Sequence, residues 1–119
     1  MDFDKATAAH AEWKVKLRVA LQDHGSLDAE RACSDKHCEL GQWLHGEARA
    51  KFSGRPAYLS CVEAHRDFHQ CAGDIARAIN RKDYEAAERL LDTGSRFADA
   101  SSQVAVAIRR LRREIEGAA

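Results

Sequence analysis

The chain has 119 residues, of which 45% are hydrophobic and 32% are charged, and this composition is typical of one globular domain. Its 19 basic and 19 acidic residues give a formal net charge of +0, which argues against a strongly basic nucleic-acid-binding surface. No run of about twenty apolar residues is present to span a membrane, and the chain is too short to hold both a sensor and an effector.

The N-terminus and the four cysteines bear on the cellular compartment. Residues 1–5 contain no apolar signal core, so we expect a cytoplasmic protein. In that compartment cysteines are more often thiols or metal ligands than structural disulfides. We therefore expect one domain over residues 1–119, whose output lies in another protein or another segment.

The first predicted element is a helix from about residue 3 to residue 20. Apolar or small positions recur there at spacings of three and four, and His10 lies in the middle of this inward stripe. Charged residues take the other faces of the helix. No segment of the chain alternates apolar and polar residues well enough to predict a strand.

A polar loop is predicted from about residue 23 to residue 36, and a short helix follows it. This helix opens near Cys38 and carries Leu40, Trp43 and Leu44 toward the core. A cysteine in the first turn of a helix has its thiolate favoured by the positive end of the helix dipole. We therefore expect Cys38 to be an ionised or easily ionised thiol.

The third predicted helix begins at Pro56, because proline suits the first turn of a helix. Its predicted inward stripe has helical spacing and consists of Leu59, Val62, His65, His69, Ala72, Ala76 and Ile79. Both histidines of this helix are thus expected to face the core.

A fourth helix is predicted from about residue 84 to residue 115. It carries two adjoining apolar stripes, which are wide enough for the core and for a partner. Gly94 lies inside this helix, where it costs roughly 1 kcal/mol relative to alanine, and we expect it to mark a close helix approach. The arginine cluster at residues 109–113 is interpreted as favourable charge near a helix C-terminus rather than as a nucleic-acid-binding patch. The predicted fold is all-α, an antiparallel four-helix bundle with one short helix that begins near Cys38.

Four residues that bind zinc well fall on these predicted inward faces: His10, Cys38, His65 and His69. His65 and His69 are one helical turn apart, so both can contact the same ion. Three imidazoles and one thiolate complete a four-coordinate shell for zinc. No member is convincing alone, because a lone histidine or cysteine on an apolar face more often belongs to the core. We predict that the four together bind Zn²⁺.

Two other kinds of metal site fit the sequence less well. Helical bundles that hold two irons place carboxylates beside their histidines, and none of these three histidines is followed four residues later by a carboxylate. A zinc hydrolase needs an open coordination position and a nearby general base, but Glu12, Glu39 and Asp67 are expected to face away from the metal. An acid that does come close is expected to orient an imidazole. We predict no catalytic residues and no enzymatic activity.

The other cysteines and histidines are assigned weaker roles. Cys61 lies one turn before His65 and is expected to fill the core rather than to serve as a spare ligand. Cys33 is expected to be an ordinary thiol, and a disulfide with oxidised Cys38 is the alternative. Cys71 is expected to point away from the inward stripe. His24 and His45 are expected in solvent near helix ends, and the direction of His37 is left open.

The residues around the four ligands resemble the signature of the bacterial chemoreceptor zinc-binding domain. The matching segments are His-Ala-Glu-Trp at 10–13, Cys-Glu-Leu-Gly-Gln-Trp at 38–43 and His-Arg-Asp-Phe-His at 65–69, in the same order and spacing. The resemblance spans nearly the whole chain. It implies a cytoplasmic four-helix bundle, often a homodimer, that binds one zinc per protomer through three histidines and one cysteine. It also implies attachment to chemoreceptors or diguanylate cyclases, whose signalling such domains adjust in response to zinc or to oxidants such as hypochlorous acid.

The distribution of the four ligands suggests a mechanism. Cys38 follows a polar loop and begins a short helix, whereas the histidines come from long helices, so Cys38 is the ligand expected to move. Zinc would hold the short helix through Cys38, and oxidation of the thiolate would free it. The alternative is a permanent structural zinc that stabilises a helical dimer and senses nothing.

Overall fold

The structure, a computed structural model, describes residues 1–117 and contains seven helices in that range. No strand occurs in this part of the chain, which confirms the all-α prediction. The long helices are α1 (Phe3–Asp23), α5 (Pro56–Asn80) and α7 (Arg96–Gly117). The short helices are α2 (Ala29–Cys33), α3 (Glu39–His45), α4 (Glu47–Phe52) and α6 (Tyr84–Leu91). None of the helices within residues 1–117 is long and apolar enough to cross a membrane.

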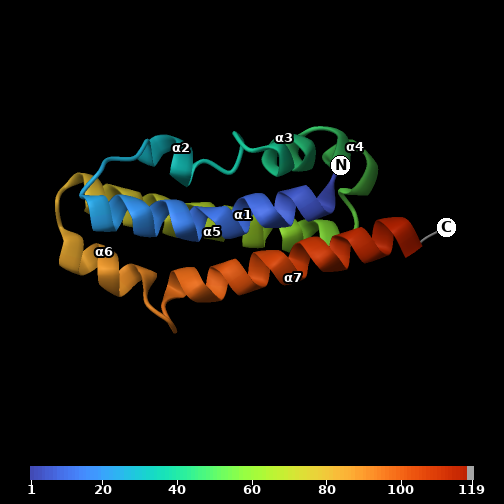
Figure 1. The fold of residues 1–119 in the computed structure, drawn as a ribbon. Coiled ribbons are helices and arrows are strands. Elements are labelled where there is room, and N and C mark those ends of the chain that lie inside the picture. Colours follow the sequence, from blue (N-terminus) through green and yellow to red (C-terminus); the bar gives the residue numbers. More distant parts are fainter. Residues whose placement is uncertain (118–119) are drawn as a thin grey trace.

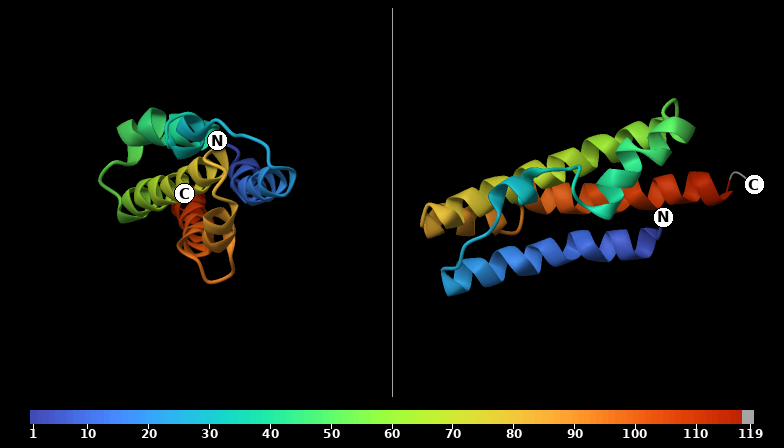
Figure 2. Two further views of the ribbon diagram at one scale, coloured as in Figure 1. Left: turned by 90° about the vertical axis from the view of Figure 1, so that its left-hand side faces the viewer. Right: turned by 90° about the horizontal axis from the view of Figure 1, so that it is seen from above.

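The chain runs back and forth along an elongated molecule (Figure 1). Helices α1 and α5 run in the same direction, the short helices α2, α3 and α4 return along one side, and α6 with α7 returns along another. Seen end-on, these four parts of the chain surround a common interior (Figure 2). Helix α5 packs against α1, α2, α3, α6 and α7, so it is the central element of the fold.

The count of four helices is not confirmed by this arrangement. The loop predicted for residues 23–36 contains α2, and the predicted fourth helix is divided into α6 and α7. The division lies at Gly94, which adopts a positive φ of 85°, and Ser95 caps the next helix by accepting the Ala98 N–H at 3.2 Å. An added Cβ on Gly94 would meet nothing within 4 Å, so this glycine forms a turn and not the predicted close helix approach.

The start of α5 confirms the role of Pro56, which occupies the first turn. The inward stripe differs from the prediction at that end, since Leu59 is 55% exposed and Val62 is only half-buried. Tyr58 takes the inward position next to Leu59, and its buried hydroxyl donates a hydrogen bond of 2.6 Å to the carbonyl of Leu44. Cys61 likewise takes the inward position next to Val62, so the stripe is shifted by one residue over the first two turns and meets the prediction again at His65.

Candidate metal centre

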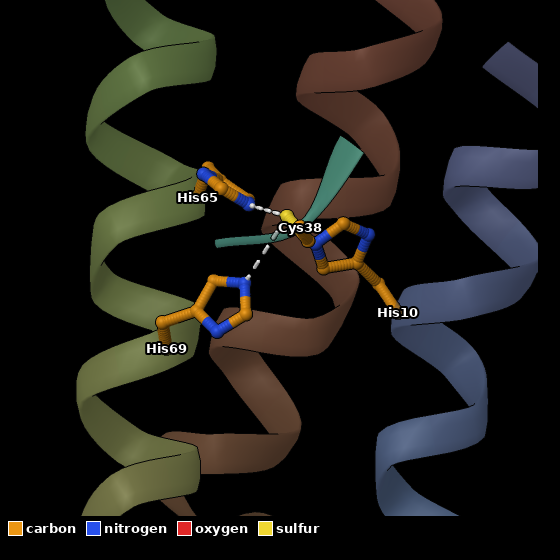
Figure 3. Close-up of side chains that lie close together, drawn as sticks. All are labelled: His10, Cys38, His65 and His69. Carbon is orange, nitrogen blue, oxygen red and sulfur yellow. Dashed lines mark hydrogen bonds between the residues drawn. The ribbon is translucent and has the colours of Figure 1, made fainter. Parts of the chain in front are cut away.

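Four side chains from three parts of the chain point toward one another in the interior (Figure 3). The His-Cys cluster consists of His10 on α1, Cys38 immediately before α3, and His65 and His69 on α5. Its four candidate ligand atoms all lie within 4.8 Å of one another. The structure thus brings together all four residues that the sequence singled out.

The distances around the Cys38 sulfur suit a tetrahedral zinc site. Sγ of Cys38 lies 3.2 Å from Nε2 of His65 and 3.8 Å from Nε2 of both His10 and His69. Zinc bonds of about 2.3 Å to sulfur and about 2.0–2.1 Å to nitrogen place tetrahedral ligand atoms about 3.5 Å apart. The three sulfur–nitrogen separations lie on either side of that value. The widest separation in the cluster, 4.8 Å, exceeds it, so zinc binding would draw the donors together by about 1 Å.

The histidines of the cluster are unusual in their burial. His65 is 0% exposed, His69 is 1% exposed and His10 is 5% exposed. No other histidine, amide or charged side chain among residues 1–117 is buried. Because a buried polar group costs free energy unless it has a partner, three of them in one place indicate a shared ligand.

Two of the three imidazoles are oriented by backbone carbonyls. Nδ1 of His10 donates to the carbonyl of Ala6 at 2.7 Å, and Nδ1 of His69 donates to the carbonyl of Ala32 at 2.9 Å. A carbonyl only accepts, so in both rings the proton is on Nδ1 and the lone pair of Nε2 faces the cluster. Nδ1 of His65 is buried and has no hydrogen-bond partner. The sequence had suggested an acid for this orienting role, but backbone carbonyls accept both hydrogen bonds.

Burial lowers the pKa of each of these histidines, and it lowers that of His65 to about 2. For His65 the neighbouring imidazoles of His69 and His10 add to the effect, because two cations side by side would repel. All three rings are consequently neutral at neutral pH. A neutral imidazole with a free lone pair is the form that binds a metal ion.

The Cys38 thiol behaves differently from the sequence-based expectation. Burial raises its pKa, and the backbone N–H groups of Gly41 and Leu40 oppose this change without reversing it. The helix start therefore does favour the thiolate, but desolvation has the larger effect. A divalent cation among the four donors would supply the positive charge that a thiolate needs here.

The donor set selects among metals. Imidazole nitrogen and thiolate sulfur are donors that suit zinc. Magnesium and calcium require oxygen ligands, and the cluster contains no carboxylate. Glu39 forms an ion pair with Lys5 at 3.6 Å, and Asp67 forms one with Arg66 at 4.0 Å. Both acids lie outside the cluster, as predicted.

The other cysteines lie outside the cluster. Cys61 is fully buried, and burial raises its pKa to about 12, so it is a core thiol as predicted. Cys71 is also buried, at 5% exposure, and Cys33 is a half-buried free thiol in α2. His45 does not stand alone in solvent, because its Nε2 lies 3.3 Å from a carboxylate oxygen of Asp35.

Sequence reasoning did not find the backbone groups that support the cluster. These are the carbonyls of Ala6 and Ala32 and the N–H of Gly41, which donates to Sγ of Cys38 at 3.3 Å. Every residue has a carbonyl, so no residue type signals that role. A signal did exist for Gly41, because it follows Cys38 by three residues. The side chain of a helix N-cap residue often accepts a hydrogen bond from the backbone N–H three residues later.

A helical domain with a buried cluster of three histidines and one cysteine belongs to the class of zinc-binding helical domains. Comparison with protein families matches residues 10–76 to the chemoreceptor zinc-binding domain, a range that covers more than half of the chain and contains the whole His-Cys cluster. The chain therefore belongs to the chemoreceptor zinc-binding domain family. Zinc is the cofactor of this family, and its members are regulatory sensory domains and not catalytic ones. Comparisons with curated proteins and with solved structures gave no match.

Proposed function

We propose that the His-Cys cluster binds one zinc ion and that residues 1–119 form one regulatory domain without catalytic activity. Family membership, the tetrahedral spacing and the neutral imidazoles support this proposal. We also propose that the fold is an antiparallel four-helix bundle in which α2, α3 and α4 together replace one helix. Zinc bound in the cluster would link α1, α3 and α5 and so contribute to stability.

The uneven anchoring of the ligands carries the proposal of a switch. The three histidines lie within helices of 21 and 25 residues and are buried. Cys38 is only half-buried and precedes α3, which has 7 residues. Isolated helices shorter than about 12–15 residues are marginal in water, so α3 depends on its surroundings for stability. Cys38 is thus the ligand whose release requires the least disruption of the fold.

Hypochlorous acid is an oxidant with suitable chemistry for this switch. It converts a thiolate to a sulfenic acid and chloride, so the sulfur loses two electrons and gains the hydroxyl group. The thiolate is the form that ligates metals, and its loss weakens the hold on zinc. We propose that this step frees α3 and that a signalling partner responds to the change.

The first test measures zinc content, zinc affinity and zinc release during titration with hypochlorous acid. We expect the wild type to hold one zinc and to release it on oxidation. Even groups that only support a ligand alter affinity by about 10–100-fold, so we expect Cys38→Ser to lower affinity by at least about 100-fold. Cys33→Ser is the matched control, because Cys33 is also a half-buried free thiol but lies outside the cluster. Zinc binding that does not depend on Cys38 would contradict the proposal.

A second test asks whether α3 moves. Hydrogen exchange of the α3 amides is expected to accelerate when zinc is removed, while exchange in the middle of α5 changes less. The reason is that α3 is tied to the cluster through Cys38, whereas α5 is held by the core on both sides of its histidines. Equal protection of α3 with and without zinc would exclude the switch.

A permanent structural zinc remains the second candidate function. It is favoured by the complete burial of His65 and by the position of zinc ligands on three separate helical segments. Tight zinc that hypochlorous acid does not release would support this candidate or a sensor of zinc itself.

The biological setting is proposed from the role of the family. We propose a cytoplasmic homodimer that regulates a bacterial chemoreceptor or diguanylate cyclase. The exposed side chain of Val106 on α7 supports the dimer, and it is considered below. Pull-down of a purified candidate partner with zinc-loaded and zinc-free protein would test the regulatory link.

A further inference from the structure

Gly41 occupies a position that only glycine can fill without movement of the backbone. A Cβ added to Gly41 would lie 1.9 Å from the carbonyl oxygen of Asp35 and 2.8 Å from its carbonyl carbon. Both distances are far below van der Waals contact, and both partners are backbone atoms of the segment that precedes Cys38. A side chain at residue 41 would therefore push α3 away from that segment.

The same residue contacts two members of the His-Cys cluster. Its N–H donates to Sγ of Cys38 at 3.3 Å. Its Cβ position lies 3.2 Å from Cε1 of His65, so the Cα of Gly41 faces the edge of this ring. No other glycine within residues 1–117 has a cluster side chain among the nearest neighbours of its Cβ position.

The contact with His65 matters because this ring lacks the support of the other two. Carbonyl groups accept hydrogen bonds from Nδ1 of His10 and His69, whereas Nδ1 of His65 has no partner. Apart from the 3.2 Å contact of its Nε2 with the Cys38 sulfur, the orientation of the His65 ring is consequently set by packing. Gly41 is part of that packing, and its position depends on the close contact with Asp35.

We propose that Gly41 is a positioning residue of the metal centre, which holds the Cys38 sulfur through its N–H and the His65 ring through its Cα. This inference rests on the proposed zinc binding. The close approach of the Asp35 carbonyl fixes α3 at the depth where both contacts form. A side chain at residue 41 changes none of the four ligand residues, but it moves the Cys38 sulfur and the His65 ring apart.

The test uses cobalt as a spectroscopic substitute for zinc in wild type, Gly41→Ala and Gly54→Ala. Gly54 is the matched control, because a Cβ there would meet nothing within 4 Å. We expect Gly41→Ala to lower zinc affinity about 10–100-fold, as loss of a supporting group does. We also expect its bound cobalt to lose intensity in the thiolate-to-cobalt charge-transfer band. Gly54→Ala should match the wild type in both measurements.

The spectrum separates positioning from general destabilisation. A variant that is merely less stable binds less cobalt, but the cobalt that it does bind has the wild-type spectrum. If Gly41→Ala has the spectrum and the zinc affinity of the wild type, the positioning role is overturned, whereas the proposal that the cluster binds zinc still stands. A wild-type protein that binds neither zinc nor cobalt would overturn the proposed function as well.

A measurement on the unaltered chain keeps the inference testable if Gly41→Ala does not fold. The wild type is loaded with a spin-active cadmium isotope, and amide protons coupled to cadmium through a sulfur-accepted hydrogen bond are identified by NMR. We expect such a coupling at the Gly41 amide. Its absence, with cadmium bound to Cys38, would overturn the role assigned to the Gly41 N–H.

Discussion

Each histidine of the His-Cys cluster is buried as a neutral base, and this links stability to pH. An unfolded histidine titrates near pH 6.5, whereas burial lowers the pKa of His10, His65 and His69 in the folded chain. At a pH between the pKa of a histidine in the folded state and its pKa in the unfolded state, the unfolded state binds more protons than the folded state. Stability is therefore fully present above pH 6.5 and is lost as the pH falls below it.

We predict that the metal-free protein becomes less stable on acidification from neutral pH. The slope is about 1.4 kcal/mol per pH unit for each histidine that is protonated only in the unfolded state. For His65, whose folded pKa is about 2, this loss continues through the whole acidic range. Urea unfolding at a series of pH values measures the effect.

A variant of the cluster tests where this pH dependence arises. His65→Gln should reduce the slope, because it removes an imidazole that is 0% exposed. Stability that rises on acidification between pH 6.5 and pH 5 would show that these histidines are not buried as neutral bases.

At the scale of the helix, α2 connects packing to the metal centre. This helix of 5 residues supplies the Ala32 carbonyl that accepts from Nδ1 of His69. It packs closely on α5 at Gly73, where an added Cβ would lie 2.5 Å from Cβ of Cys33 and 2.9 Å from its Cα. The absence of a side chain at Gly73 thus sets the distance between α2 and α5.

We predict that Gly73→Ala weakens zinc binding without altering any ligand. The added methyl group displaces α2, stretches the hydrogen bond to His69 and lowers zinc affinity by about 10–100-fold. Overpacking should also lower the free energy of unfolding by about 1–3 kcal/mol. Chelator competition and urea unfolding measure the two effects, with Gly54→Ala as the control. A loss of stability at unchanged zinc affinity would limit α2 to a packing role.

The elements also show what the sequence could and could not predict. Long periodic stripes gave α1 and α5, and they placed His10, His65 and His69 on inward faces because a buried stripe repeats over several turns. Helix α2 spans little more than one turn, so no period exists to detect it. Its one local signal is Asp28, whose side chain accepts the Arg31 N–H at 3.1 Å.

The sequence pattern did not reveal the break between α6 and α7, because here the periodicity is long and continuous rather than too short. Apolar residues keep a helical spacing on both sides of Gly94, so the pattern predicted one continuous helix. Glycine is compatible with a helix interior and with a left-handed turn, and tertiary packing decides between them. At Gly94 the packing of Leu91 and Phe97 into the same core selects the turn.

For the molecule as a whole, one large apolar side chain of α7, that of Val106, remains exposed on the surface. Val106 is 57% exposed and borders a shallow depression between α5 and α7. Small side chains line this depression, among them Ser60, Ala64 and Ala107. Small residues around an exposed valine permit a close approach by another helix. This surface is our candidate for the interface of the proposed homodimer.

We predict that Val106→Glu converts the proposed dimer to a monomer. It places a carboxylate in the contact, and the cost of burying that charge exceeds the gain from its neighbour Arg110, which lines the same depression. The matched control is Val15→Glu on α1, since Val15 is 61% exposed and lies outside this depression. Sedimentation of both variants and the wild type measures the assembly, and zinc content checks that each variant retains the metal centre. Dissociation by Val15→Glu alone would move the interface to α1, and a monomeric wild type would exclude the dimer.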